Sequence, residues 1–466
     1  MSGSPVIKWK VLSGLAVALV VAIAITAAAS EGFAADTPEP DSREAIGVVL
    51  QILSATPGVP ELAYDYVDEN WRDGFAPMLL EMMSLARGPE QRGEMFKLLR
   101  RKTGKDFVDQ DSFWEYVWKK QAEPHPYYAE FKAALYALID PKFRGYFSSE
   151  RTSRIRLDEV RWGGVRQDGI PPLRGPKMIR ANAADYLDDS NVVFGLEVEG
   201  DARAYPKRIL AWHEMFVDTI GGVPVAGVYC TLCGSMVLYE TTHKGVDYAL
   251  GTSGFLYRSN KLMYDKATQS LWNTLWGRPV IGPLADQDIT LKRRSVVTST
   301  WGEWLRRHPD TMVLSLDTGH ARDYSEGTAY RSYFATDKLM FNVPRLDKRL
   351  KNKDEVLALV SSDESAQLAI SAKYLSKNRV HHDQVGEEQF VVLTDPSGAN
   401  RAYSVGDARF QSWDGDTLAV DAVGSRWRVH EDRIESDEGQ TFPRFAAHRA
   451  FWFGWHAAYP DTRLVK

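Results

Sequence analysis

The sequence predicts an α+β protein with an N-terminal helical domain and a larger, mainly antiparallel β domain with interspersed helices, built as a barrel or a sandwich. Up to about residue 147, apolar residues recur at helical spacing. From about residue 192 onward, short runs rich in β-branched and aromatic residues dominate, separated by Gly, Pro and Asn. The length of 466 residues also exceeds what one hydrophobic core usually serves.

The N-terminus has the features of an export signal. Lys8 and Lys10 precede an uncharged apolar run over residues 11–29, and Gly32-Phe33-Ala34 offers small residues where signal peptidase reads them. We expect residues 1–35 to be a cleaved signal. The alternative is an uncleaved membrane anchor formed by residues 11–29, because a spanning helix needs about 20 apolar residues. Either way the protein is exported, to the periplasm or the extracellular space.

Residues 36–156 are expected to form helix pairs, as in an α-solenoid. EAIGVVLQILS, FAPMLLEMMSLA and GEMFKLLRRKTG show helical periodicity, and Gly88-Pro89 and Gly104 separate the segments.

Residues 157–466 are expected to form the β domain. QFVVLTDPSGANRAYSV predicts a hairpin, and helices are expected at 209–215, at 300–308 and in the closing FWFGWHAAY. His381-His382 lie in a charged stretch that indicates a solvated turn.

Composition and motifs narrow the function classes. The net charge of -5 argues against nucleic-acid binding, which normally requires a basic surplus. The sequence contains no GxSxG, HExxH, P-loop or GxGxxG motif, which disfavours the common hydrolases, zincins and nucleotide-binding enzymes.

The two cysteines, Cys230 and Cys233, form a CxxC motif on a turn that follows the strand-like VPVAGVY and ends at Gly234. Three interpretations stay open. Two thiolates bind a soft metal such as copper(I), the pair cycles between dithiol and disulfide, or the pair is inert. A structural zinc site is disfavoured, because it needs four ligands.

His213, Glu214 and Asp218 lie shortly upstream in RILAWHEMFVDTIGG. On a helix over 209–216, the first two side chains leave about 100° apart and can border one cleft. We expect His213 to join Cys230 and Cys233 as a copper ligand, or to act as a base oriented by Glu214 or Asp218. This hypothesis requires the sulfurs and the imidazole to share a solvent-accessible pocket.

Residues 251–277 combine polar and aromatic side chains and form a candidate substrate-binding wall. The candidates are Ser253, Arg258, Asn260, Asp265 and Trp272. Arg258 and Asn260 supply donors for an anion or a carbonyl, and Trp272 and Trp276 are expected on one face of a strand. The alternative is a hairpin whose polar groups satisfy one another.

Several long stretches resemble the bacterial domain-of-unknown-function family numbered 3179. They include DEVRWGGVRQDGIPPL, ARAYPKRILAWHEMFVD, VYCTLCGSMVLYE, GTSGFLYRSNKLMYDKATQSLWNTLWGRPVIGPL, TWGEWLRRHPDTMVLSLDTG and HRAFWFGWHAAYPDT. The resemblance covers about residues 157–466 and implies an exported protein without an assigned activity. His213, Glu214, Asp218 and both cysteines fit the family's pattern, whereas Val217 stands where the family usually has Asn.

The leading hypothesis is therefore an exported protein with a thiol-centred site for copper binding or redox chemistry. A second hypothesis is a binding or scaffold module that holds a peptide, glycan or protein in an aromatic groove, with an inert cysteine pair. A third is a hydrolase or lyase that uses His213 and Asp218 without a metal.

Overall fold

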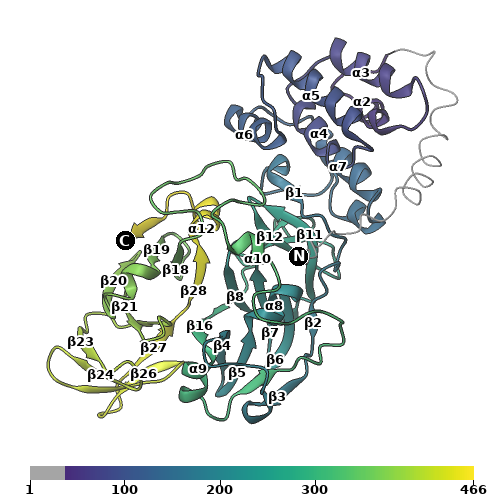
Figure 1. Cartoon of the computed structure of the whole chain (residues 1–466). Helices are drawn as coiled ribbons and strands as arrows, with labels where there is room; N and C mark the ends of the chain where they lie inside the picture. Colours follow the sequence, from purple (N-terminus) through teal and green to yellow (C-terminus); the bar gives the residue numbers. More distant parts are fainter. Residues whose placement is uncertain (1–36) are drawn as a thin grey trace, which may run out of the picture. The chain divides into compact units, whose positions relative to one another are not determined.

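The computed structural model describes residues 37–466 (Figure 1). The predicted signal or anchor lies outside these described residues. Within them, no helix combines the length and the apolar composition needed to cross a membrane. The chain divides into two compact units: one ends at Arg161 and includes Ile281–Ala285, and the other holds Trp162–Val280 and Asp286–Lys466.

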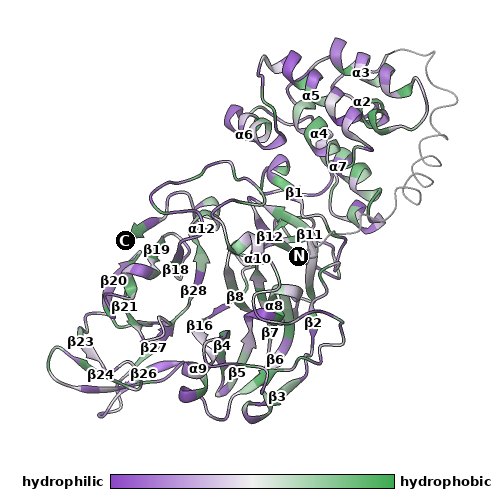
Figure 2. Cartoon of the chain, in the orientation of Figure 1, coloured by the Kyte–Doolittle hydropathy of each residue, from purple (hydrophilic) through white to green (hydrophobic). Residues whose placement is uncertain are grey.

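The first unit is helical, as the periodicity predicted. Its helices are α2 (Arg43–Leu50), η1 (Gln51–Leu53), α3 (Val59–Glu69), α4 (Phe75–Met82), α5 (Pro89–Thr103), α6 (Gln110–Lys120), α7 (Tyr128–Ala137), η2 (Pro141–Gly145) and η3 (Leu157–Glu159). Ser42 and Asp109 cap α2 and α6 by accepting hydrogen bonds from backbone N–H groups in the first turn. All eight residues of α4 are buried, whereas α5 buries only three, and Figure 2 shows the corresponding difference in hydropathy.

The second unit is built mainly from antiparallel sheets. Three sheets have the strand orders β15-β8-β7-β6-β2, β16-β4-β5-β17-β3 and β28-β18-β19-β29, and another contains β11-β12-β13-β14 in that order. An eight-stranded sheet has the order β20-β21-β22-β27-β26-β25-β24-β23, and β9 and β10 form a small ribbon. The predicted α+β class with a large antiparallel β region is confirmed.

The elements up to β17 have the following bounds: β1 (Val160–Trp162), β2 (Leu173–Arg174), β3 (Met178–Arg180), η4 (Ala181–Ala183), β4 (Val192–Val198), β5 (Asp201–Pro206), α8 (Lys207–His213), β6 (Met215–Ile220), β7 (Val223–Cys230), β8 (Ser235–Glu240), β9 (Thr242–His243), β10 (Val246–Asp247), β11 (Leu250–Tyr257), β12 (Asn260–Asp265), β13 (Leu271–Asn273), β14 (Arg278–Ile281), β15 (Arg293–Arg294), β16 (Val297–Thr300), α9 (Trp301–Arg307) and β17 (Met312–Leu314).

The remaining elements are α10 (Arg331–Phe334), β18 (Glu355–Val360), β19 (Gln367–Ser371), α11 (Ala372–Leu375), β20 (Val380–Val385), β21 (Glu388–Thr394), β22 (Asn400–Ser404), β23 (Phe410–Trp413), β24 (Leu418–Asp421), β25 (Arg426–Val429), β26 (Arg433–Ser436), β27 (Thr441–Phe445), β28 (Ala447–Phe451), α12 (Trp452–Ala458) and β29 (Arg463–Val465).

The eight-stranded sheet curls into a nearly closed barrel. The predicted hairpin is its β21–β22 pair. The prediction of a solvated turn at His381-His382 is wrong, because both residues lie in β20 and pair with β21. The Nε2 atom of His382 accepts a hydrogen bond from the Phe410 backbone N–H at 2.9 Å, which ties the first strand of the sheet to the last.

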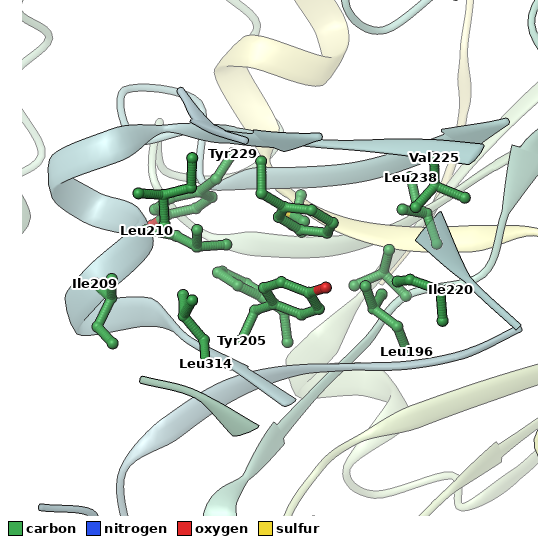
Figure 3. Close-up of a cluster of buried hydrophobic side chains, with 14 of the residues drawn as sticks. Leu196, Tyr205, Ile209, Leu210, Ile220, Val225, Tyr229, Leu238 and Leu314 are labelled. Atoms are coloured by element: carbon green, nitrogen blue, oxygen red, sulfur yellow. The ribbon is translucent and has the colours of Figure 1, made fainter. Parts of the chain in front are cut away.

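A hydrophobic core between two of the sheets holds the site region in place. Side chains from β4 and β5 meet those from β6, β7 and β8, and α8 closes one end with Ile209 and Leu210 (Figure 3). Tyr205 stacks on Phe216 with ring centroids 3.8 Å apart. The ring of Tyr229 packs on Phe194 at 4.9 Å, which anchors the end of the strand that carries the first cysteine.

Candidate functional site

The CxxC motif lies on the tight turn between β7 and β8. Cys230 is the last residue of β7 and pairs with Ser235, so that Thr231, Leu232, Cys233 and Gly234 form the connection. The two Sγ atoms are 2.7 Å apart, and both cysteines are free. Gly234 has φ 58°, and a Cβ there would lie 2.8 Å from the ring of Phe451. The turn therefore needs glycine both for its backbone conformation and for its packing.

Both thiols are buried. Cys230 is 2% exposed and Cys233 is 0% exposed, within an apolar cluster that includes Leu256, Tyr333 and Phe451. The Cys233 thiol donates to the carbonyl oxygen of Ser259 at 3.1 Å. The predicted solvent-accessible position of the sulfurs is thus not found.

A buried ion pair lies beside the turn. Glu214 and Lys261 form it, and each side chain is 7% exposed. The hydroxyl of Thr231, between the two cysteines, donates to Glu214 Oε1 at 2.6 Å, and the Tyr330 hydroxyl donates to the same oxygen at 3.0 Å. Glu214 has φ 56° because it ends α8 in the left-handed conformation. The carboxylate is thereby fixed against the cysteine turn.

The environment gives the two thiols different pKa values. Burial works to raise the pKa of Cys230, but the hydrogen bond between the two cysteines, together with the backbone N–H and the ammonium of Lys261, outweighs burial and lowers it. The pKa of Cys233 is raised well above its ordinary value, first by burial and then by the hydrogen bond between the cysteines and the charge of Cys230. Cys230 is therefore the thiol that ionises first.

His213 does not join the thiols. Its Nδ1 atom lies 2.9 Å from the carbonyl oxygen of Pro171, and its Nε2 atom lies 2.6 Å from the hydroxyl of Tyr324. Burial lowers its pKa to about 4, so the imidazole is neutral at physiological pH. Across residues 37–466, no group of three or more His, Cys, Asp and Glu side chains could hold a metal ion. The expected copper set of Cys230, Cys233 and His213 is therefore not assembled.

Asp218 is engaged elsewhere as well. On β6, it accepts hydrogen bonds from Arg203 Nη1 at 2.7 Å and from the Tyr205 hydroxyl at 2.9 Å. These contacts join β6 to β5, and they leave Asp218 neither beside the sulfurs nor hydrogen-bonded to His213. Val217, the departure from the family pattern, pairs with Ala226 of β7 in the same sheet.

Three of the predicted substrate-binding residues hold the β11–β13 region together. The Ser253 hydroxyl donates to the Leu262 carbonyl at 2.6 Å, next to an irregularity in the pairing of β11 with β12. Asp265 accepts from the Thr268 backbone N–H at 2.7 Å and from the Trp272 indole at 3.3 Å. Trp272 is buried in β13, which ends at Asn273, so the expected strand face shared with Trp276 does not form.

The other two predicted residues connect the thiol region to α12. Arg258 Nη1 donates to the Ala457 carbonyl at 3.1 Å, and Asn260 Nδ2 donates to the Gly454 carbonyl at 3.0 Å. Gly454 packs on the second cysteine, because a Cβ added there would lie 2.9 Å from Cys233 Cβ. Arg258 and Asn260 thus position a helix that covers the thiols.

Sequence reasoning missed Lys261, Thr231 and Tyr330. A signal for Lys261 exists in the sequence, because NKLMYD places the lysine directly before the apolar Leu262 and Met263 of a strand, where a buried cation requires a partner. Tyr330 gives no comparable signal, because it comes from an irregular segment far along the chain.

A pocket adjoins the turn. It has a volume of about 180 Å³, and its lining includes Tyr229 and Gly234, the residues immediately before and after the cysteine pair. Neither cysteine lines the pocket. Its other walls come from β4, β16, β18, β28, the first residue of α8 and the loop at Ser397-Gly398.

The comparisons with known proteins identify a family whose function is not known. The family model described as "Protein of unknown function (DUF3179)" matches residues 167–462, which is more than half of the chain and includes the whole candidate site. No curated protein and no solved structure matches the chain. The resemblance seen in the sequence is thereby confirmed. The chain belongs to the DUF3179 family of proteins of unknown function.

Proposed function

We propose that the protein is an exported thiol redox protein in which Cys230 and Cys233 cycle between dithiol and disulfide. The observation that carries this proposal is the pair itself: two free thiols 2.7 Å apart, of which one has a lowered pKa and the other a raised one. This asymmetry suits thiol exchange, since the thiolate is the attacking species and the second thiol must stay protonated until it is needed.

The proposed reaction uses a small disulfide as the oxidant. The Cys230 thiolate attacks one sulfur of that disulfide and releases the other as a thiolate, which takes the Cys233 proton. The Cys233 thiolate then attacks the Cys230 sulfur, closes the internal disulfide and releases the second half of the oxidant. Once the mixed disulfide forms, Cys230 carries no charge, which removes one cause of the raised pKa of Cys233.

The Glu214–Lys261 pair tunes this site. Lys261 stabilises the thiolate through its backbone N–H and its ammonium, whereas the carboxylate of Glu214 opposes the thiolate. Because Thr231 donates to Glu214, the carboxylate also fixes the turn that holds the two sulfurs together. His213 and Asp218 have no part in this proposal.

The burial of both sulfurs favours a second candidate, a binding module with an inert cysteine pair. An oxidant reaches the thiols only if covering side chains such as Phe451 or Tyr333 are displaced. The two candidates therefore differ in whether the thiols of the folded protein react with an external reagent.

The rate of iodoacetamide alkylation, measured against pH in the reduced wild type, Cys230→Ser and Cys233→Ser, separates the candidates. The redox proposal expects reaction in the folded wild type with an apparent pKa below 9, the ordinary value. It also expects that Cys230→Ser no longer shows the alkylation step with this lowered apparent pKa. Alkylation seen only in denaturant would establish the inert pair. If the anaerobically purified wild type contains stoichiometric copper and both variants lack it, the function is metal binding and not redox chemistry.

A further inference from the structure

The pocket beside the cysteine turn lies wholly within the second unit and has the composition of a ligand site. Its volume of about 180 Å³ is smaller than the roughly 300–1,000 Å³ of pockets for drug-sized ligands, so its ligand is a small molecule. Its walls combine aromatic rings, from Phe194, Tyr229 and Phe451, with charged groups.

The charges in the pocket sum to one positive. Glu355 and Arg449 form an ion pair at 2.7 Å, and the other two guanidinium nitrogens of Arg449 donate to Asn400 at 2.7 Å and to the Gly398 carbonyl at 2.6 Å. Lys207 is the remaining charge. Its Nζ atom lies 4.7 Å from the centre of the Phe334 ring, and no carboxylate in the described part of the chain pairs with it. Because this partly exposed ammonium has no carboxylate partner in residues 37–466, it is available to pair with an anionic ligand.

Three residues that line the pocket, Tyr229, Thr298 and Ser299, have buried hydroxyl groups without a hydrogen-bond partner among residues 37–466. Tyr229 is 1% exposed, and its hydroxyl forms no hydrogen bond with any residue of 37–466. The hydroxyls of Thr298 and Ser299 are likewise buried and unpaired within that range. Neighbouring side chains of a strand point to opposite faces, and Thr298 is the one that pairs with Phe194, another residue of the pocket wall. Buried polar groups are normally satisfied, so the Tyr229 and Thr298 hydroxyls point to a ligand that accepts hydrogen bonds.

Tyr229 also connects the pocket to the thiols. Its pKa is raised well above the ordinary value, first by burial and then by the charges of Cys230 and Glu355, so the hydroxyl stays protonated and available as a donor. Cys230 follows Tyr229 directly in β7, and Gly234 places the other end of the cysteine turn at the same pocket.

We propose that this pocket binds the oxyanion group of a small molecule, a carboxylate or a phosphate, between the Lys207 ammonium and the Tyr229 and Thr298 hydroxyls. The binding itself is independent of the redox chemistry. If the thiols are redox-active as proposed above, the bound molecule is placed to act as their reaction partner; that step rests on the proposed function.

Calorimetric titration of the full-length protein with inorganic phosphate and, separately, with acetate tests this proposal, with sodium chloride of matched ionic strength as the blank. Saturable binding of either probe is expected. Lys207→Met and Tyr229→Phe should each weaken it about ten- to a hundredfold, the usual effect of removing a hydrogen bond to a charged group. Lys244→Met is the matched control, because Lys244 is exposed and pairs with Asp288; its affinity should equal that of the wild type.

The two probes distinguish the two sources of the oxyanion, since the tighter one identifies the class. No saturable binding of either probe, or equal affinity in wild type, Lys207→Met and Tyr229→Phe when melting curves show that all three are folded, would overturn the proposal. The alkylation experiment distinguishes the failure of one proposal from the failure of the other. If an oxyanion binds but the thiols are inert, the redox function is rejected and the binding site stands. If the thiols react but no oxyanion binds, the binding site is rejected and the redox function stands.

Discussion

Replacement of Lys261 by Met removes the cation of the buried pair next to the thiols while keeping a side chain of similar length. Glu214 then remains 7% exposed with its two hydroxyl donors, Thr231 and Tyr330, but without an opposite charge. Breaking a buried ion pair by removing one partner costs about 3–5 kcal/mol. Because the two hydroxyls still stabilise the carboxylate, we expect a loss near the lower end, about 3 kcal/mol of the free energy of unfolding.

Lys292→Met is the control in the same unit. Lys292 pairs with Glu240 at 2.8 Å, but its side chain is 65% exposed, so its loss should cost about 0–1 kcal/mol. Urea denaturation of both variants gives the comparison. The double variant Glu214→Gln/Lys261→Met should be more stable than Lys261→Met alone, because it leaves no unpaired buried charge.

Lys261→Met can also be tested through the pKa of Cys230. The Lys261 ammonium helps to lower that pKa, so it should rise in Lys261→Met and remain unchanged in Lys292→Met. Equal stability losses in the two lysine variants, or an unchanged thiol pKa in Lys261→Met, would refute the role assigned to the pair.

Three further predictions concern packing and pH. Because burial lowers the pKa of His213 from 6.5 to about 4, its contribution to stability should be complete above pH 6.5 and lost as the pH falls toward 4. His213→Gln should therefore flatten that part of a curve of unfolding free energy against pH. An unchanged slope would contradict the lowered pKa of His213. Gly195→Ala should cost about 1–3 kcal/mol in urea unfolding, because its Cβ would overlap the indole of the buried Trp304; a neutral result would show that the indole moves freely. Gly454→Ala, whose Cβ would lie 2.9 Å from Cys233 Cβ, should change the alkylation rate of the thiols, and wild-type kinetics would show that α12 does not fix them.

The architecture could be predicted because periodicity and turn residues act locally. The helices of the first unit, the β21–β22 hairpin and the α12 helix all follow from such patterns. The strand that carries His381-His382 could not be predicted, because between Val380 and Val385 it contains only polar residues and depends on pairing with β21.

The site could be predicted only in part. The proximity of Glu214 to the cysteine turn followed from their order in the sequence. The sequence did not indicate that the His213 imidazole contacts Pro171 and Tyr324 instead of the thiols. The left-handed conformation of Glu214 at the end of α8 sends neighbouring side chains to different partners, and that conformation depends on tertiary packing. Lys261 and Tyr330 reach the site from segments distant in the sequence. The local pattern around Lys261 indicates that the lysine is buried, but it does not identify Glu214 as the partner, and Tyr330 has no local signal.

The most direct test of the central claim is the dithiol–disulfide equilibrium of Cys230 and Cys233 in the folded protein. After equilibration in a series of glutathione redox buffers and acid quenching, intact mass spectrometry gives the fraction of each form. A redox-active pair should show one reversible two-electron transition from a dithiol to an internal disulfide that is lighter by two hydrogens, and Cys230→Ser should not show it. A pair that exchanges with glutathione only after the protein is denatured would contradict it.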